Sequence, residues 1–365
     1  MRLTSLEVTN VRNLQSVSLN PHSRTNFIVG PNGSGKTSLL ESISLLSNGR
    51  SFRSADTKKL ITQGSDQLVV FGKVCAESLK ESRLGISKDS VGNTHARLDG
   101  ERLCKVSVLA KMLPSIAIDT SSVDLIEGGP SLRRSMLDWG LFHVEHSYLD
   151  AWSQYRAALR QKNALLKSAA NVTPHQVNYW NAVLERYGER LHTERTQYVD
   201  ALSVHTQRIF LHYFGSDVDI EFKYRAGWNR HEYPHFADCL HSKVESEIER
   251  RSCVYGPHRA ELDILWGGTL AKDICSRGQK KLVLYGVRLA QISLMLDRTG
   301  VSPVLLLDDL PAEMDKKNIE NVTRFLTEFP CQTFITAINE QSIDDTLLAG
   351  LMDHTMFHVE HGTLR

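Results

Sequence analysis

The stretch GPNGSGKT, Gly30 to Thr37, decides the fold that we expect for this chain. It fits the pattern G-x-x-x-x-G-K-[ST], follows an apolar run at residues 26–29 and precedes an amphipathic run at residues 36–47. A turn of this kind between a buried strand and a helix lets main-chain N–H groups face phosphate oxygens. The alternative, a simple glycine-rich turn, does not explain the strand before it and the helix after it.

We therefore predict a nucleotide site in this loop. Its candidate residues are Gly30, Pro31, Asn32, Gly33, Ser34, Gly35, Lys36 and Thr37. We expect Lys36 to contact the β- and γ-phosphates and the Thr37 hydroxyl to bind Mg²⁺. The chain lacks the N-K-x-D pattern that recognises guanine, so we expect ATP as the nucleotide.

A second candidate site follows another apolar run. Residues 304–307 are Val-Leu-Leu-Leu, and Asp308 and Asp309 come directly after them. Carboxylates at the C-terminal end of a buried strand lie where ligands bind in α/β sheets. We expect Asp308 to hold Mg²⁺, through water or together with Thr37, and Asp309 to orient and polarise the attacking water. The alternative is an acidic turn after a strand.

The third candidate is Ser-Arg-Gly-Gln at residues 276–279, at the start of a predicted helix. Small and polar residues at a helix N-terminus suit an anion, because free N–H groups point outward there. Taken alone, the stretch is better explained as a plain helix cap. Beside the other two motifs, we expect Ser276, Gly278 and Gln279 to bind nucleotide.

Composition limits the class of protein. The chain has 365 residues, with 43 basic and 42 acidic side chains and a formal net charge of +1, so any basic face must be local. Six cysteines lie far apart without a C-x-x-C pair, which favours reduced thiols over a disulfide framework or a zinc site. The sequence shows neither a signal-peptide pattern nor an apolar run long enough to cross a membrane. We expect a cytoplasmic protein without a membrane partner.

Hydrophobic periodicity predicts an α/β protein with a helical insertion. Alternating residues at 68–74, 83–88 and 94–103 predict strands of an antiparallel meander. From residue 146 to about residue 213 the pattern is helical, with a turn before Pro174, which indicates an antiparallel helical hairpin or simply two packed helices of a bundle. We expect a split nucleotide-binding domain at residues 1–115 and 250–365, and a helical lobe at residues 116–249.

The pentapeptide FHVEH occurs twice, starting at Phe142 and at Phe357. The residues around the two copies are not similar, so we interpret them as a coincidence and not as a repeat. We expect the four histidines of the copies to be packing or surface residues rather than metal ligands. They are His143, His146, His358 and His361.

The three motifs together resemble those of ABC-type ATPases, although Arg277 stands where the usual Ser-Gly-Gly-Gln signature has its first glycine. Other stretches resemble the RecF family of bacterial recombination mediators over nearly the whole chain. These are LEVTNVRNL, DLIEGGPSLRRSMLDWGLFHVE, VYGPHRAELDI and LLLDDLPAEMD, in that order. The resemblance implies an ABC-type P-loop ATPase head, with a mixed sheet that includes an antiparallel meander, and an inserted α-helical lobe.

The same resemblance implies a function. We expect an ATP-dependent homodimer that binds double-stranded and single-stranded DNA at gaps and helps RecR, and indirectly RecO, to load RecA. It would act in recombinational repair, replication restart and the SOS response. We expect weak, DNA-stimulated ATP hydrolysis that times release, in a protein that primarily binds. The alternative is an ATP-gated structural DNA clamp of the chromosome-organising ABC class, which the sequence does not separate from a loader.

Further roles are implied residue by residue. Ser276 would contact the γ-phosphate of an ATP held by the P-loop of another subunit. Residues 312–315 match the loop that crosses the dimer interface. Arg12 matches a basic position near the phosphates, and Gln63 matches the glutamine loop that supplies a magnesium ligand. The switch histidine is missing, because residues 336–339 are Thr-Ala-Ile-Asn, so the sensor of the γ-phosphate is unassigned.

Two basic clusters are candidates for DNA contact. One follows the P-loop helix and the other lies in the expected helical lobe, and each is equally explained as a solvated charged face. They are Arg50, Arg53, Lys58 and Lys59, and Arg133 and Arg134. Contacts of this kind would bind phosphates without reading the base sequence.

Overall fold

The computed structural model describes residues 1–54, 56–75, 80–168, 172–215, 219–343, 345–351 and 353–364. The chain divides into two compact units. The first is formed by Met1–Ser122 and Gly300–Arg365, and the second by Val123–Thr299. Each unit has its own sheet structure and its own helices.

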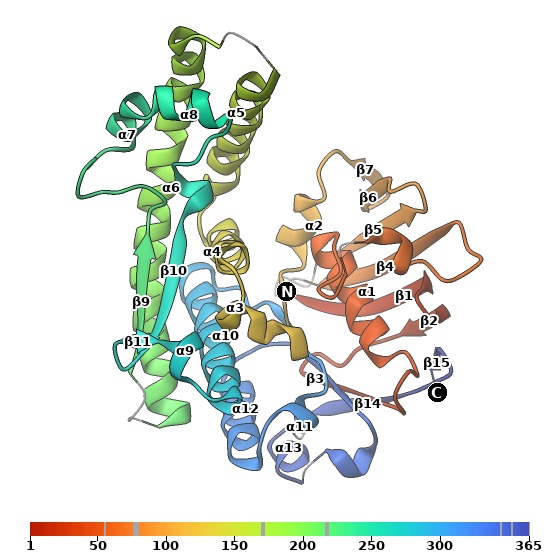
Figure 1. Cartoon of the computed structure of the whole chain (residues 1–365). Helices are drawn as coiled ribbons and strands as arrows, with labels where there is room; N and C mark the ends of the chain where they lie inside the picture. Colours follow the sequence, from red (N-terminus) through yellow and green to blue (C-terminus); the bar gives the residue numbers. More distant parts are fainter. Residues whose placement is uncertain are drawn as a thin grey trace. The chain divides into compact units, whose positions relative to one another are not determined.

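The first unit contains an antiparallel sheet with the strand order β2-β1-β4-β5-β6-β7 (Figure 1). Its strands are β1 (Arg2–Val11), β2 (Leu14–Leu19), β4 (Gln67–Cys75), β5 (Glu81–Asp89), β6 (Thr94–Leu98) and β7 (Glu101–Leu103). Strands β4 to β7 pair in sequence order. This is the antiparallel meander that alternating residues predict. Asp99 and Gly100, both at positive φ, form the turn between β6 and β7.

A second sheet of the first unit has the order β15-β14-β3-β13-β12-β8. Its strands are β3 (Thr25–Val29), β8 (Ser115–Ile118), β12 (Val304–Leu307), β13 (Thr333–Ala337), β14 (His354–Glu360) and β15 (Thr363–Leu364). All pairs are parallel except β14 with β15. Every residue of β3, β12 and β13 is buried, which explains why these strands are mainly apolar, because parallel strands are covered on both faces.

Helix α1 (Lys36–Asn48) supplies much of the core of this unit. Its Leu39, Leu40 and Ile43 are fully buried in one cluster with Leu6 of β1 and Leu306 of β12. The cluster therefore contains residues of both sheets, and the helix after the P-loop is held rigidly. The other helices of the unit are α2 (Ser107–Met112), α11 (Leu310–Glu313), α12 (Lys316–Glu328) and α13 (Asp345–Gly350).

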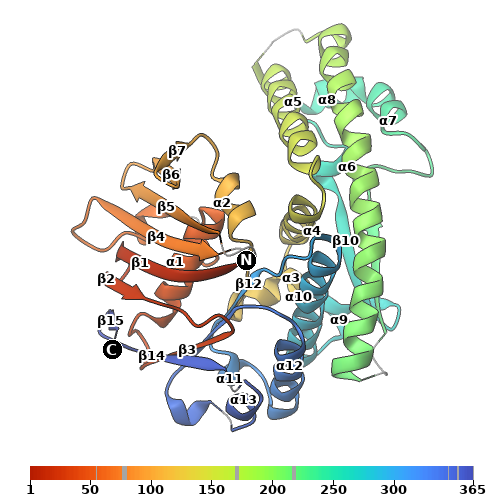
Figure 2. The same cartoon turned by 180° about the vertical axis from the view of Figure 1, so that it is seen from behind.

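The second unit is mainly helical and carries the three-stranded sheet β11-β10-β9 (Figure 2). Its helices are α3 (Asp124–Glu127), α4 (Pro130–Val144), α5 (Tyr148–Ser168), α6 (Pro174–Ile209), α7 (Phe236–Ser242), α8 (Val244–Arg250), α9 (Ala271–Ile274) and α10 (Arg277–Thr299). Its strands are β9 (Ile220–Arg225), β10 (Glu261–Trp266) and β11 (Thr269–Leu270). Helix α6 begins with Pro174 after a capping box of Thr173 and Gln176.

Helices α5 and α6 run antiparallel, as two pairs of contacts show. Lys162 Nζ donates to Asn181 Oδ1 near one end, and Arg195 Nε donates to the Tyr148 hydroxyl, 3.2 Å away, near the other. Both figures show the two helices side by side. Lys162 also pairs with Glu247 of α8, and both side chains are essentially unexposed.

The limits of the two units differ from the boundaries predicted at residues 115 and 250. The first unit extends to Ser122 because β8 pairs with β12. The second unit continues to Thr299 because α10 packs against α4 and α6. The helix that begins with the Ser-Arg-Gly-Gln stretch therefore belongs to the second unit. Among the described residues, no helix is long and apolar enough to span a membrane.

Candidate functional site

Three parallel strands bring the sequence motifs of the first unit to one edge of its sheet. Strand β3 ends directly before Gly30, and β12 ends directly before Asp308. Strand β13 lies between them, and the Gly30 N–H donates to the carbonyl oxygen of its last residue, Ala337, at 3.3 Å. The carboxyl ends of parallel strands form the edge where ligands bind.

The P-loop is closed around its own lysine. Lys36 is 5% exposed, and its Nζ donates to the carbonyl oxygens of Gly30, at 2.7 Å, and Pro31, at 3.2 Å. Gly33 and Gly35 take positive φ angles, as a tight turn requires. Helix α1 begins without a side-chain cap and without an acidic residue in its first turn. Its N-terminal N–H groups are therefore suited to an anion.

Asn13, in the turn between β1 and β2, braces the loop and was not singled out from the sequence. Its Nδ2 donates to the Gly33 carbonyl oxygen at 3.0 Å, and its Oδ1 accepts from the Ser38 hydroxyl at 2.9 Å. A single asparagine thus ties the loop to the helix that follows. In the sequence it stands within LEVTNVRNL, one of the stretches that carry the family resemblance.

The C-terminal hairpin of β14 and β15 braces the other side of the loop. The Gly362 N–H donates to the Ser34 carbonyl oxygen at 2.9 Å. A Cβ atom added to Gly30 would lie 2.2 Å from the Val359 carbonyl oxygen, so only glycine fits there. The second FHVEH copy, which the sequence presents only as a repeated pentapeptide, and Gly362 after it therefore support the P-loop.

The two acids differ in environment. The Asp308 carboxylate accepts hydrogen bonds from the Thr37 hydroxyl, at 3.0 and 3.1 Å, and from the Thr336 hydroxyl, at 2.8 Å. Burial raises the pKa of Asp308, the hydrogen bond from Thr336 lowers it, and the nearby Asp309 raises it again. Asp309 has φ 53°, in the left-handed region. Its Oδ1 is buried and makes no hydrogen bond to a described residue.

This donor set fits Mg²⁺. The groups that meet are a hydroxyl and two carboxylates, and hard oxygen ligands are those that Mg²⁺ prefers beside a bound phosphate. The elevated pKa of Asp308 would fall next to a cation, since an opposite charge favours the ionised form.

Arg12 and Gln63 are placed differently from these groups. Arg12 pairs with the fully buried Glu41 of α1 through two hydrogen bonds, so a phosphate contact would require Arg12 to leave this partner. Gln63 is exposed in the turn after the bridge between Val11 and Ile61. The hydrogen bonds of Thr37 and Asp308 to described residues do not include it, and its role as a magnesium ligand stays a prediction.

The Ser-Arg-Gly-Gln stretch begins α10 in the second unit with a reciprocal cap. The Gln279 N–H donates to the Ser276 hydroxyl at 3.3 Å, and the Ser276 N–H donates to Gln279 Oε1 at 2.8 Å. All four residues from Ser276 to Gln279 are exposed. A Cβ atom added to Gly278 would meet nothing within 4 Å. The cap explains Ser276 and Gln279 within the chain, but the fold gives no reason for Gly278.

The residues of the two basic clusters differ in burial and in hydrogen-bond partners. Arg133 is buried, pairs with Glu261 through two hydrogen bonds of 2.8 Å and also donates to main-chain carbonyls. It stabilises the second unit and is not a candidate for DNA contact. Arg134 donates to the Ala260 carbonyl oxygen at 2.8 Å. Arg53 is exposed, and its charge lowers the pKa of Asp308, which places it near the acids. The cluster of Arg50, Lys58 and Lys59 is exposed.

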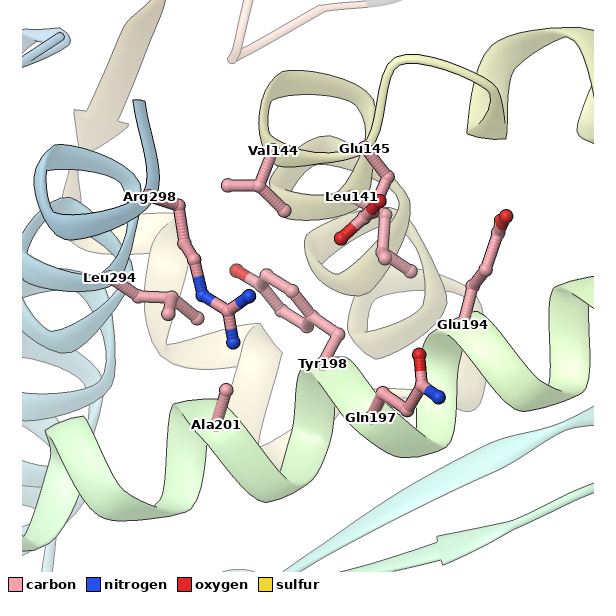
Figure 3. A pocket seen from close by; sticks show the side chains of 9 residues that line it. All are labelled: Leu141, Val144, Glu145, Glu194, Gln197, Tyr198, Ala201, Leu294 and Arg298. Atoms are coloured by element: carbon pink, nitrogen blue, oxygen red, sulfur yellow. The ribbon is translucent and has the colours of Figure 1, made fainter. Parts of the chain in front are cut away.

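The second unit also has a cavity of about 260 Å³ between α4, α6 and α10 (Figure 3). Its walls are Leu141, Val144, Glu145, Glu194, Gln197, Tyr198, Ala201, Leu294 and Arg298. None of the predicted nucleotide residues lines it. The lining combines apolar side chains with charges of both signs, Glu145, Glu194 and Arg298, so it does not single out one class of ligand.

Comparisons with known proteins identify the family of this chain. A family model of the RecF/RecN/SMC N-terminal domain matches residues 2–361. The DNA replication and repair protein RecF of Aliivibrio fischeri (strain MJ11) is 36% identical over 364 residues, which cover 100% of this chain and 99% of that protein. The protein of the same name from Acinetobacter baumannii (strain AB307-0294) is 37% identical over 362 residues, 99% of this chain and 98% of that protein.

Solved structures show the same architecture. The recombination mediator protein RecF with ATP, described within the RecFOR pathway, has a TM-score of 0.88 at 25% identity, covering 100% of this chain and 96% of that chain. An Smc head bound to the C-winged helix domain of ScpA has a TM-score of 0.60 at 15% identity, with the same coverage of both chains, and shows the fold alone. The predicted ABC-type ATPase head with an inserted helical lobe is therefore confirmed. The chain belongs to the RecF family.

Proposed function

We propose that this chain is an ATP-dependent DNA-binding protein of recombinational repair and replication restart. The observation that carries the proposal is the meeting of Lys36, Thr37, Asp308 and Asp309 at one sheet edge. Relatives with 35% identity or more over the full chain are named DNA replication and repair protein RecF, and a similar solved structure contains ATP.

Each of these residues has a part in binding or hydrolysis. Lys36 offers its ammonium group to the β- and γ-phosphates in exchange for two loop carbonyls. Thr37 and Asp308 hold Mg²⁺, which neutralises phosphate charge when it is bound. Asp309 orients the attacking water with the carboxylate oxygen that lacks a partner among the described residues. No histidine stands directly after β13, where the chain continues with Ile338 and Asn339, which supports slow hydrolysis that times release.

ATP drives the formation of a homodimer with two composite sites. The support is Gly278, which is exposed, has open space around it and lies in the first turn of α10. Glycine lowers helix stability by roughly 1 kcal/mol relative to alanine, so its presence favours close approach of another group. Ser276, Gly278 and Gln279 contact the γ-phosphate held by the partner's P-loop, and residues 312–315 cross the interface.

On DNA, the dimer acts at gaps between double-stranded and single-stranded regions, where it engages RecR and, through it, RecO and RecA. The support is membership of the family and the RecFOR pathway of the similar solved structures. Hydrolysis is weak and DNA-stimulated. The exposed cluster of Arg50, Lys58 and Lys59 supplies phosphate contacts.

Mixing two inactive variants tests the composite site. Lys36→Met loses the charge in the P-loop, and Ser276→Arg places a bulky cation where the γ-phosphate must meet the signature. We expect neither variant to hydrolyse ATP alone. A mixed dimer keeps one intact P-loop facing one intact Ser276, so the mixture should recover up to about half of the wild-type ATPase per dimer on gapped DNA.

The control is Ser168→Arg, which also adds a cation at an exposed serine in a helix of the second unit. It should keep wild-type ATPase and ATP-dependent dimer mass in light scattering. If mixed dimers form and show no ATPase, Ser276 is only a helix cap and the composite site is wrong. If the wild type binds neither ATP nor DNA, the proposed function itself fails.

A further inference from the structure

The hydroxyl group of Thr336 lies between the two acids of the site. Thr336 is in β13 and is 0% exposed. Its hydroxyl donates to Asp308 Oδ1 at 2.8 Å and accepts the Asp309 N–H at 2.7 Å. One oxygen atom therefore binds the side chain of the first acid and the main chain of the second. No sequence motif assigned a role to this residue.

The main chain of Asp309 needs such support. Its φ of 53° lies in the left-handed region, which is unfavourable for residues other than glycine and is best tolerated by Asn and Asp. Its carbonyl oxygen accepts from the N–H groups of Ala312, at 2.9 Å, and Glu313, at 3.1 Å. With the N–H held by Thr336, both sides of the residue are fixed. This conformation leaves Asp309 Oδ1 buried and without a partner among the described residues.

Asp308 also depends on Thr336 once the site is in use. Two hydroxyl groups donate to its carboxylate, those of Thr37 and Thr336. The Thr37 oxygen is the one that the proposed function assigns to Mg²⁺. Thr37 can bind the cation through its oxygen lone pairs and still donate its proton to Asp308, and Thr336 remains the second donor to the same carboxylate.

We propose that Thr336 is the positioning residue of the ATPase site: it sets the orientation of Asp308 and Asp309 relative to each other through its hydroxyl group and not through its volume. The inference rests on the proposed ATP hydrolysis. It concerns how the acids are aligned, because the Thr336 hydroxyl acts through Asp308 and Asp309.

Thr336→Val tests this directly, because valine has the same shape and lacks the hydroxyl. We expect the single-turnover hydrolysis rate on gapped DNA to fall at least about tenfold, as expected for a lost hydrogen bond to a charged group. ATP affinity without Mg²⁺ should stay within about twofold, because the P-loop is unchanged. Thr336→Ser keeps the hydroxyl and should restore the rate to within about threefold of the wild type.

The matched control is Thr333→Val, a buried threonine of the same strand at its other end. It should leave the hydrolysis rate unchanged. If Thr336→Val does not fold, the pair Thr336→Ser and Thr336→Ala decides the question, because the two differ only in the hydroxyl oxygen. Circular dichroism and thermal unfolding establish which variants are folded.

The outcomes are distinct. Three results would each overturn the inference while leaving the ATPase intact. They are wild-type hydrolysis by a folded Thr336→Val, a Thr336→Ser as slow as the valine or alanine variant, and a Thr333→Val as slow as Thr336→Val. A wild-type protein that neither binds nor hydrolyses ATP would overturn the proposed function and the inference with it. A slow valine variant rescued by serine, with unchanged Mg²⁺-free affinity, supports the assignment.

Discussion

Asp308 and Asp309 are neighbours in the chain, but their carboxylates differ in hydrogen bonding. Asp308 has two hydroxyl donors, and burial raises its pKa. Asp309 is turned by its left-handed main chain so that Oδ1 is buried without a partner among the described residues. A buried carboxylate oxygen without a hydrogen bond is costly unless a ligand or water satisfies it. This difference supports the proposed division of roles, in which Asp308 holds Mg²⁺ and Asp309 orients the attacking water.

Asparagine substitutions should separate these two roles. Asp308→Asn removes a ligand charge, so Mg²⁺-dependent ATP affinity should fall at least about tenfold. Asp309→Asn tolerates the left-handed conformation, so this variant should bind ATP and dimerise, yet hydrolyse about a hundredfold more slowly. Titration calorimetry with and without Mg²⁺, together with single-turnover hydrolysis, measures both effects. Identical behaviour of the two variants would show that the roles are divided wrongly.

At the scale of elements, the first turn of α10 combines a stabilising cap with a destabilising glycine. The helix starts with a capping box of Ser276 and Gln279, which stabilises it. Gly278 then weakens it, although the surroundings offer room for a side chain. Local rules of this kind are broken most often at functional sites, where the loss in stability is offset by a gain in binding.

Gly278→Ala should therefore make the protein more stable and less active. We expect the free energy of unfolding to rise by about 0.5–1 kcal/mol, because alanine is the better helix former. ATP-dependent dimerisation should weaken, because the added methyl group occupies the space of the partner's phosphate. Thermal unfolding and light scattering with ATP measure the two properties. A variant that is stabilised and still dimerises fully would contradict the close approach at Gly278.

For the whole molecule, the formal net charge of +1 is close to neutral, and buried groups with shifted pKa values contribute to the pH dependence of stability. Burial lowers the pKa of His258 from 6.5 to about 4, and that of His192 in the same direction and to a similar value. His258 Nε2 lies 3.2 Å from the Cys253 carbonyl oxygen and must carry the proton, so Nδ1 accepts from the Tyr155 hydroxyl at 2.7 Å. The His258 side chain is therefore a neutral imidazole in the folded second unit.

This predicts a loss of stability in mild acid. The pKa of His258 is lower in the folded chain than in the unfolded chain. The contribution of the neutral side chain to the free energy of unfolding is therefore complete above pH 6.5. It falls as the unfolded chain takes up a proton and is lost below about pH 4. The loss should reach up to about 3 kcal/mol for this residue. Thermal unfolding between pH 7 and pH 4 should show a shallower slope for His258→Gln than for the wild type. The exposed His175→Gln should keep the wild-type slope, and equal slopes for all three would refute the assignment.

Short contiguous motifs in the sequence predicted most of the fold and the residues at the centre of the candidate site. The P-loop between an apolar run and an amphipathic run predicts strand, turn and helix without reference to the rest of the chain, because backbone geometry there depends on local residues. The two acids after residues 304–307 follow in the same way, since the end of a buried parallel strand marks the binding edge. The meander and the long helices were likewise predicted from their periods of hydrophobic residues.

The burial and the hydrogen-bond partners of several residues are decided only by tertiary packing, because the neighbouring residues in the sequence do not determine them. The pentapeptide FHVEH ends helix α4 in its first copy and lies mostly in strand β14 in its second. Arg133 resembles a surface cation in sequence, yet it pairs with Glu261, 128 residues away. Asn13, Gly362 and Thr336 reach the site from three distant segments. Burial and hydrogen bonding of such groups depend on which surfaces meet in the folded chain, so no local pattern announces them.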